Sequence, residues 1–192
     1  MRKLLSLVAV VMVTTFTFAQ KTLVSDAAHS RIQFIVTHLG INDITGNLDK
    51  ADLTFKLDEK NFLNSNISFE ADVNTINTHI EARDNHLKSA DFFDVAKYPK
   101  MVFVGRSITK GKMKNYYKVS GDLTIHGVTK PVSLVLVNRG KTVNPMSKAD
   151  TYAFQVMGTI KRSDFQVGAN FPEAVISDLV RIKGDFELVE KK

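Results

Sequence analysis

The chain has 192 residues, a net charge of +6 and no cysteine. Without cysteine it has neither a disulfide framework nor an acceptor for a lipoprotein anchor. The charge is mild and interspersed, and the densest basic run, Lys110–Lys114, contains no aromatic residue. Such a run between two predicted strands indicates a solvated hairpin tip, so we expect no nucleic acid partner.

Residues 1–19 have the order of a secretory signal peptide. Arg2 and Lys3 form a basic start, Leu4–Val13 is an apolar run too short to span a bilayer, and residues 17–19 place small side chains where a signal peptidase reads. The alternative is a buried N-terminal strand or helix. We expect cleavage after Ala19, a periplasmic or secreted mature protein, and no stable membrane anchor.

Residues 20–192 are long enough for one domain with a full core, and no Pro/Gly/Ser-rich linker divides them. Most of this part alternates apolar and polar residues with period two, which predicts an all-β, antiparallel fold. We expect the first two strands to form a hairpin and Gly46 to bend the third. The predicted strands are Leu23–Ala27, Arg31–Leu39, Ile44–Leu57, Asn66–Ile76, Met101–Thr109, Tyr116–His126, Val132–Arg139, Tyr152–Arg162 and Asp178–Glu190.

About eight or nine strands in an open sheet would leave exposed edges, whereas closure into a barrel removes them. Glycines near the middle of several strands suit the sharp bends of such a barrel. The inward faces carry Phe, Val, Ile and Leu with almost no charge. This pattern fits a filled core and an apolar pocket equally well. The mid-strand glycines are Gly46, Gly105, Gly121, Gly158 and Gly184.

One segment, Arg83–Asp94, interrupts the strands with a polar and aromatic helical pattern. A short helical insertion in an all-β protein is expected to close or line what the sheet encloses. Phe92 and Phe93 near its end have two interpretations. They anchor the insertion to the core, which is the commoner role of such a pair, or they contact a bound molecule directly.

Several motifs stand in order along the chain: residues 26–34, His38-Leu39-Gly40, residues 85–94 followed by Tyr98-Pro99, residues 119–130, and residues 160–165. Together they resemble the YceI-like polyisoprenoid-binding family. The resemblance implies a lipocalin-like antiparallel barrel, an amphiphilic isoprenoid or other long-chain lipid inside it, and export to the periplasm. One departure is Gln166, where the pattern leads us to expect glycine in the turn.

Polar residues expected near the helix or a barrel end are candidates for binding a lipid head group, and inward apolar residues are candidates for contacting its tail. For Arg83 and His86 the alternatives are a solvated or ion-paired surface group and a tie between helix and strand. The head-group candidates are His38, Arg83, Asn85, His86 and Arg162. The tail and plug candidates are Phe34, Phe69, Phe92, Phe93, Phe154, Val156, Gly158, Ile160, Phe165, Ile182 and Phe186.

Catalysis is a weaker interpretation. His29 and Ser30 are neighbours on a predicted strand and point to opposite faces, while Ser89 and His86 could meet on one helical face but lack a nucleophile elbow. His79 and His86 do not form a compact metal-ligand pattern. We therefore expect a lipid carrier with no enzymatic activity, no metal and no cofactor beyond the bound lipid. A structural or stress-related interaction protein without a ligand is the alternative, a hydrolase is less favoured, and a homodimer is left open.

Overall fold

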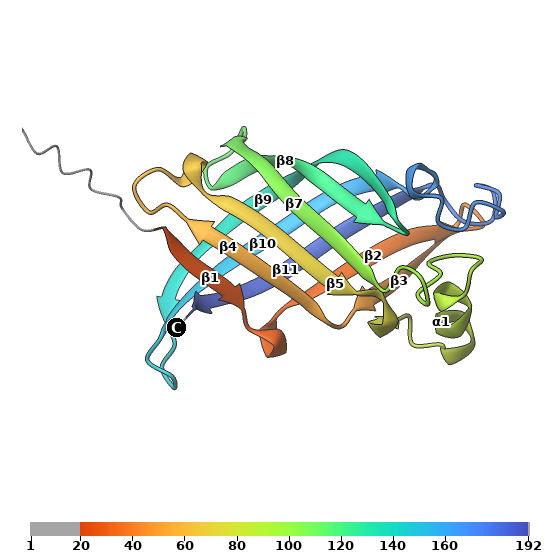
Figure 1. Cartoon of the computed structure of the whole chain (residues 1–192), viewed down its shortest axis with the longest axis horizontal. Coiled ribbons are helices and arrows are strands. Elements are labelled where there is room, and N and C mark those ends of the chain that lie inside the picture. Colours follow the sequence, from red (N-terminus) through yellow and green to blue (C-terminus); the bar gives the residue numbers. More distant parts are fainter. Residues whose placement is uncertain (1–19, 192) are drawn as a thin grey trace, which may run out of the picture.

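The computed structural model describes residues 20–191, so the predicted signal peptide lies outside the described residues. The fold is mostly β: a closed, eight-stranded antiparallel barrel with one short helix, α1 (Glu81–Lys88), at one end (Figure 1). This confirms the predicted fold class. Within residues 20–191, no helix is long and apolar enough to cross a membrane.

Eleven strands fill the eight positions of the barrel, because three positions are each shared by two strands in line. β1 and β2 share one position, β3 and β4 the next, and β5 and β6 the third. The remaining strands run in chain order until β11 closes the barrel against β1 and β2. The bounds are β1 Lys21–Ser25, β2 Arg31–His38, β3 Asn42–Leu48, β4 Ala51–Leu57, β5 Asn66–Asp72, β6 Ile76–Asn77, β7 Lys100–Lys110, β8 Tyr116–Ile125, β9 Val128–Val143, β10 Asp150–Lys161 and β11 Leu179–Glu190.

The predicted hairpin between the first two strands is wrong. β1 and β2 both pair antiparallel with β11, through Leu23 opposite Glu190 and Ile32 opposite Gly184. The chain between them forms a short 3₁₀ turn, η1 (Ala27–His29), in which the Ala28 amide donates to the side chain of Asp26. The turn residues therefore bulge out of the barrel wall and the strand resumes in the same direction.

The long third strand was predicted to bend at Gly46, but its break falls at Asp49 and Lys50, between β3 and β4. The backbone N–H of Lys50 leaves the sheet and donates to the Thr75 hydroxyl at 3.0 Å. Gly46 instead admits the ring of Phe34 from the neighbouring strand, since a Cβ there would lie 2.2 Å from the ring. Of the predicted bends, Gly105 does adjoin a register shift between β7 and β8.

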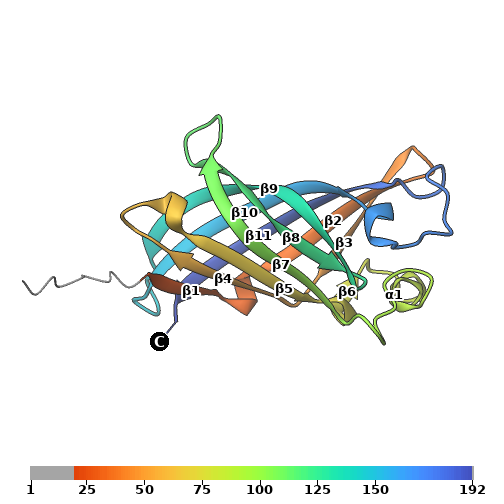
Figure 2. The same ribbon diagram turned by 45° about the horizontal axis from the view of Figure 1, so that its top comes forward.

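The two ends of the barrel carry different connections. At one end α1, the β2–β3 turn and the long β10–β11 loop (residues 162–178) gather, and at the other lie the β4–β5 and β9–β10 connections and the C-terminus (Figures 1 and 2). The 3₁₀ turn η4 (Ser163–Phe165) begins the long loop and ends at Gln166, which has a left-handed φ of 59°. The turn expected at a glycine is therefore formed with glutamine in the conformation that glycine favours.

Candidate ligand-binding cavity

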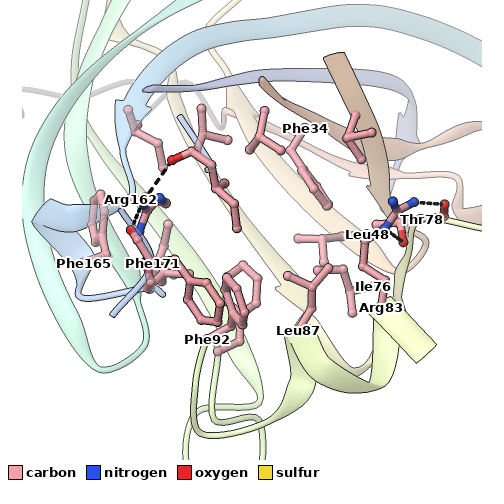
Figure 3. A pocket seen from close by; sticks show the side chains of 18 of the residues that line it. Phe34, Leu48, Ile76, Thr78, Arg83, Leu87, Phe92, Arg162, Phe165 and Phe171 are labelled. Carbon is pink, nitrogen blue, oxygen red and sulfur yellow. Dashed lines mark hydrogen bonds between the residues drawn. The ribbon is translucent and has the colours of Figure 1, made fainter. Parts of the chain in front are cut away.

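A cavity of about 330 Å³ opens at the end of the barrel that carries α1. Its wall is mainly apolar and comes from β2, β3, β6, β7, β8, β10 and β11, with α1 and the β10–β11 loop at the mouth (Figure 3). The rest of the lumen is filled by packed side chains. The two interpretations that sequence left open, a filled core and an apolar pocket, therefore each describe one part of the barrel. The polar lining residues are His38, Thr78, Arg83, His86 and Arg162.

Arg83 is held at the cavity wall by hydrogen bonds to Thr78, which precedes α1. Its Nε donates to the Thr78 hydroxyl at 2.7 Å and Nη2 donates to the Thr78 carbonyl at 2.8 Å. Thr78 is buried, and its amide and hydroxyl both donate to the carboxylate of Asp84 in the first turn of α1. Among the described residues, Nη1 of Arg83 has no hydrogen-bond partner. The guanidinium thus keeps a donor available while its position is held.

Arg162 is buried, with 8% of its surface exposed, and it organises the β10–β11 loop. Its guanidinium makes five hydrogen bonds, all to backbone carbonyls, which matches its five N–H donors. In Figure 3 it lies on the opposite side of the cavity from Arg83. A ligand would therefore meet the charge of Arg162 but no free donor. The acceptors are the carbonyls of Val167, Gly168, Phe171, Ile176 and Ser177.

An aromatic cluster joins α1 to the same loop above the cavity. Phe92 is buried and stacks on Phe171 with ring centroids 4.6 Å apart. The His86 ring meets both edge-on, at 5.1 Å from Phe92 and 5.7 Å from Phe171. Its Nε2 lies 3.0 Å from a carboxylate oxygen of Asp91. Phe92 thus packs in the core and lines the cavity, so the two predicted roles do not exclude one another.

Most of the predicted site residues line the cavity. Their contact with a ligand stays a prediction, since the structure fixes only their positions. Asn85 lies outside the cavity, on the exposed side of α1. The lining head-group candidates are His38, Arg83, His86 and Arg162, and the lining tail candidates are Phe34, Phe92, Phe93, Ile160, Phe165 and Ile182.

Five tail candidates lie away from the cavity. Phe154 stacks on Phe55 at 4.7 Å, and Phe69 stacks on Phe103 at 5.3 Å. Gly158 was predicted to contact the tail, but Leu134 occupies the space beside it, because a Cβ on Gly158 would lie 2.4 Å from Leu134 Cδ2. The alternation placed these residues on the inward face, but it carries no information on how far along the barrel the lumen stays open. The five are Phe69, Phe154, Val156, Gly158 and Phe186.

Sequence reasoning missed the loop residues of the mouth. Phe171, Val175 and Ile176 line the cavity from a segment without strand periodicity. The available signal was composition, because residues 171–176 place apolar side chains in a long connection where solvated residues are usual.

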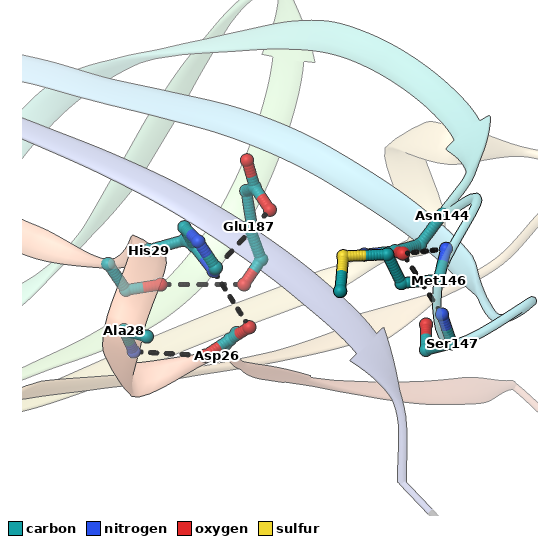
Figure 4. A network of polar contacts seen from close by, with 8 residues as sticks. Asp26, Ala28, His29, Asn144, Met146, Ser147 and Glu187 are labelled. Atoms are coloured by element: carbon teal, nitrogen blue, oxygen red, sulfur yellow. Dashed lines mark hydrogen bonds and ion pairs between the residues drawn. The ribbon is translucent and has the colours of Figure 1, made fainter.

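The hydroxyls weighed as nucleophiles have other contacts. The Ser89 hydroxyl donates to the backbone carbonyl of His86 at 2.8 Å and not to its ring. The Ser30 hydroxyl donates to the Glu187 carbonyl, while the His29 ring lies 2.9 Å from the carboxylate of Asp26 (Figure 4). In the described part of the chain, no three His, Asp or Glu side chains gather as a metal site.

The chain resembles proteins of known sequence over most of its length. It is 35% identical over 162 residues to UPF0312 protein SAS2572 of Staphylococcus aureus (strain MSSA476), which covers 84% of this chain and 86% of that protein. A family model described as the YceI-like domain matches residues 23–188.

Solved structures share the fold. BcnA of Burkholderia cenocepacia superposes with a TM-score of 0.75 at 25% identity, covering 87% of this chain and 99% of BcnA. The Campylobacter jejuni YCEI protein gives 0.72 at 29% identity, covering 81% and 90%. A domain from Saccharophagus degradans described as polyisoprenoid-binding gives 0.64 at 17% identity, covering 90% and 99%, which is a likeness of fold alone. Over residues 23–188, this chain belongs to the YceI-like domain family.

Proposed function

We propose that the mature protein is an extracytoplasmic carrier that binds an amphiphilic isoprenoid or another long-chain lipid, with the apolar tail in the cavity and the head group at the mouth. The observation that carries this proposal is the cavity itself: an apolar chamber of about 330 Å³ in an otherwise filled barrel. Such a volume is at the lower end of the range for ligand pockets. Each methylene buried there gains about 0.8 kcal/mol, so a tail supplies affinity.

The polar groups at the mouth support a head group that accepts hydrogen bonds. The lining contains the guanidinium groups of Arg83 and Arg162 and no carboxylate. Arg83 has the available donor, and His38 and His86 line the same region. A phosphate, carboxylate or carbonyl oxygen suits this lining, whereas an amine would meet like charge. No reaction is assigned.

The proposed location rests on the first residues of the sequence. A basic start, an apolar run and small residues before Gln20 are the parts of an export signal. N-terminal sequencing of the protein from its own envelope fraction should begin at Gln20, with no lipid attached to the chain. A mature protein that retains Met1 would contradict the extracytoplasmic location.

The carrier function is tested with the protein purified from its own envelope, by native mass spectrometry followed by organic extraction. We expect a prenyl or acyl species on the wild type. A variant with the cavity filled, Val36→Phe with Ile182→Phe, should carry much less. The control is Val104→Phe, which adds the same ring to an outward-facing, 51% exposed position and should keep its lipid.

Other outcomes distinguish the alternatives. An empty wild-type protein that ignores added lipids would contradict the carrier and favour a structural or stress-related interaction protein. Turnover of an ester substrate would favour a hydrolase. Native mass spectrometry of the same sample reports whether the protein is a homodimer.

A further inference from the structure

We propose that three large side chains, Phe103, Leu134 and Phe186, form a floor beneath the cavity and set the length of chain that the protein binds. We call these three residues the floor layer. The inference rests on the proposed function and adds the residues that determine its specificity for chain length.

The position of the floor follows from β10 and β11. Ile160 and Ile182 line the cavity, and the next inward positions away from the mouth are Gly158 and Gly184. Neither glycine leaves open space. A Cβ on Gly158 would lie 2.4 Å from Leu134, and a Cβ on Gly184 would lie 2.5 Å from the ring of Phe186. On these two strands the open part of the lumen therefore ends at Gly158 and Gly184, directly beyond Ile160 and Ile182.

The lining on β7 and β8 ends in a similar way. Met101 of β7 and Ile125 of β8 line the cavity, and the next inward residues, Phe103 and Leu123, do not. The ring of Phe103 lies over Gly121, where a Cβ would come within 2.6 Å of it, and stacks on Phe69. All three floor residues are at most 3% exposed. Large side chains laid over glycines thus close the lumen from both walls.

A closed floor makes a specific prediction about affinity. For a homologous series of ligands, each added methylene should raise affinity about fourfold while it enters the cavity, which is the equivalent of about 0.8 kcal/mol. Once the chain reaches the floor, further methylenes remain in water and the gain stops. A plot of affinity against chain length should therefore rise and then level off at a breakpoint.

The experiment measures this plot by titration calorimetry, with delipidated protein and the saturated fatty acids from octanoate to octadecanoate as probes. In Leu134→Ala, the removed side chain opens space beside Gly158, and the breakpoint should move to longer chains by about two to four methylenes, with affinity for the longest probes raised tenfold or more. Leu136→Ala is the matched control. Leu136 is buried on the same strand and face but lies one inward position farther from the cavity.

A second variant works in the opposite direction and does not depend on opening the core. Ile160→Phe adds a ring inside the cavity and should move the breakpoint to shorter chains. If neither Leu134→Ala nor Ile160→Phe moves the breakpoint of the wild type, the proposed role of the floor layer is wrong, while the carrier function still stands. The same holds if Leu136→Ala shifts it as far as Leu134→Ala. If the wild type binds neither the fatty acid probes nor lipid extracted from its own envelope, both the carrier function and the role of the floor layer are wrong.

Discussion

A loop aromatic covers each end of the barrel, but the two ends differ in what lies beneath. At the end that carries the β4–β5 connection, Phe62 sits 4.3 Å from Tyr117 and 5.6 Å from Phe55, ring centroid to centroid, and the lumen under it is solid. At the other end Phe171 stacks on Phe92, and the cavity lies below them. We call these the packed half and the hollow half.

The difference comes from the direction in which inward side chains lean. In the packed half, rings from opposite strands meet across the lumen, as Phe55 and Phe154 do at 4.7 Å. In the hollow half, the ring of Phe34 lies over Gly46 of the neighbouring strand, and Phe34 lines the open cavity. The same alternating pattern therefore builds a solid core where rings from different strands meet, and a chamber where they do not.

The largest expected effect on stability is that of Phe154→Ala in the packed half. This substitution removes an aromatic ring from a residue that is only 2% exposed. We expect a loss of about 3–5 kcal/mol in the free energy of unfolding, because a cavity remains where rings were packed. Ile182→Ala in the hollow half should cost only about 1–2 kcal/mol, since its side chain already faces the chamber. Denaturant titration of the ligand-free proteins measures both.

Ligand binding should show the opposite order. Ile182→Ala should weaken lipid binding several-fold, whereas Phe154→Ala should leave it within about twofold at a temperature where the protein stays folded. Equal losses of stability in the two variants would mean that the hollow half is filled in solution, and would remove the distinction.

A second prediction concerns what keeps the mouth of the hollow half in place. Arg162→Met keeps much of the side-chain volume but leaves five loop carbonyls without their donor, and should cost about 2–3 kcal/mol. Hydrogen exchange should accelerate in residues 163–178 and not in β4 or β5. Arg83→Met, which loses two hydrogen bonds, is the control and should cost about 1 kcal/mol. Unchanged exchange in the loop would show that Arg162 does not hold it.

The fold and part of the cavity lining could be predicted from the sequence, whereas the strand connections and the extent of the cavity could not. Period-two alternation predicted the all-β barrel, the ordered motifs predicted the family, and the position of the helical insertion predicted lining residues such as Arg83 and Phe92. The in-line strands β1 and β2 were missed because a turn signal does not say whether the chain reverses or resumes. The extent of the cavity was missed because the lean of Leu134 over Gly158 depends on tertiary packing, which no local pattern encodes.

A third prediction compares a turn in each half. Gln166 at the mouth and Lys148 in the β9–β10 connection both adopt a left-handed φ, of 59° and 60°. Replacing either by glycine relieves the contact between Cβ and the backbone, although it adds freedom to the unfolded chain. We expect Gln166→Gly and Lys148→Gly each to raise the free energy of unfolding by about 0.5–1 kcal/mol. A loss at Gln166 alone would indicate that its side chain has a contact which the mouth requires.

The smallest expected effect lies at the junction of the two halves, where η1 separates β1 from β2. A hydrogen bond that the His29 ring donates to the carboxylate of Asp26, with the charges of Asp26 and Glu187, raises the pKa of His29 above 6.5. The bonds of Asp26 to His29 and to the Ala28 amide lower the pKa of Asp26 below 3.8. Because the pKa of His29 is raised on folding, its contribution to stability is present below about pH 6.5 and is lost as the pH rises through the folded pKa. The contribution of Asp26 is present above about pH 3.8 and is lost as the pH falls through its folded pKa.

The pair should therefore stabilise the junction most between these two values. The difference in denaturation midpoint between wild type and His29→Gln is expected to be largest near about pH 5 and to shrink toward about pH 8. The effect is small because both side chains are exposed to solvent. In an Asp26→Asn background, the same comparison should lose most of its dependence on pH, since the main partner of the imidazolium is gone. A difference that persists unchanged to high pH would mean that His29 supports the bulge by packing alone, and that the junction between the packed and hollow halves is not held by charge.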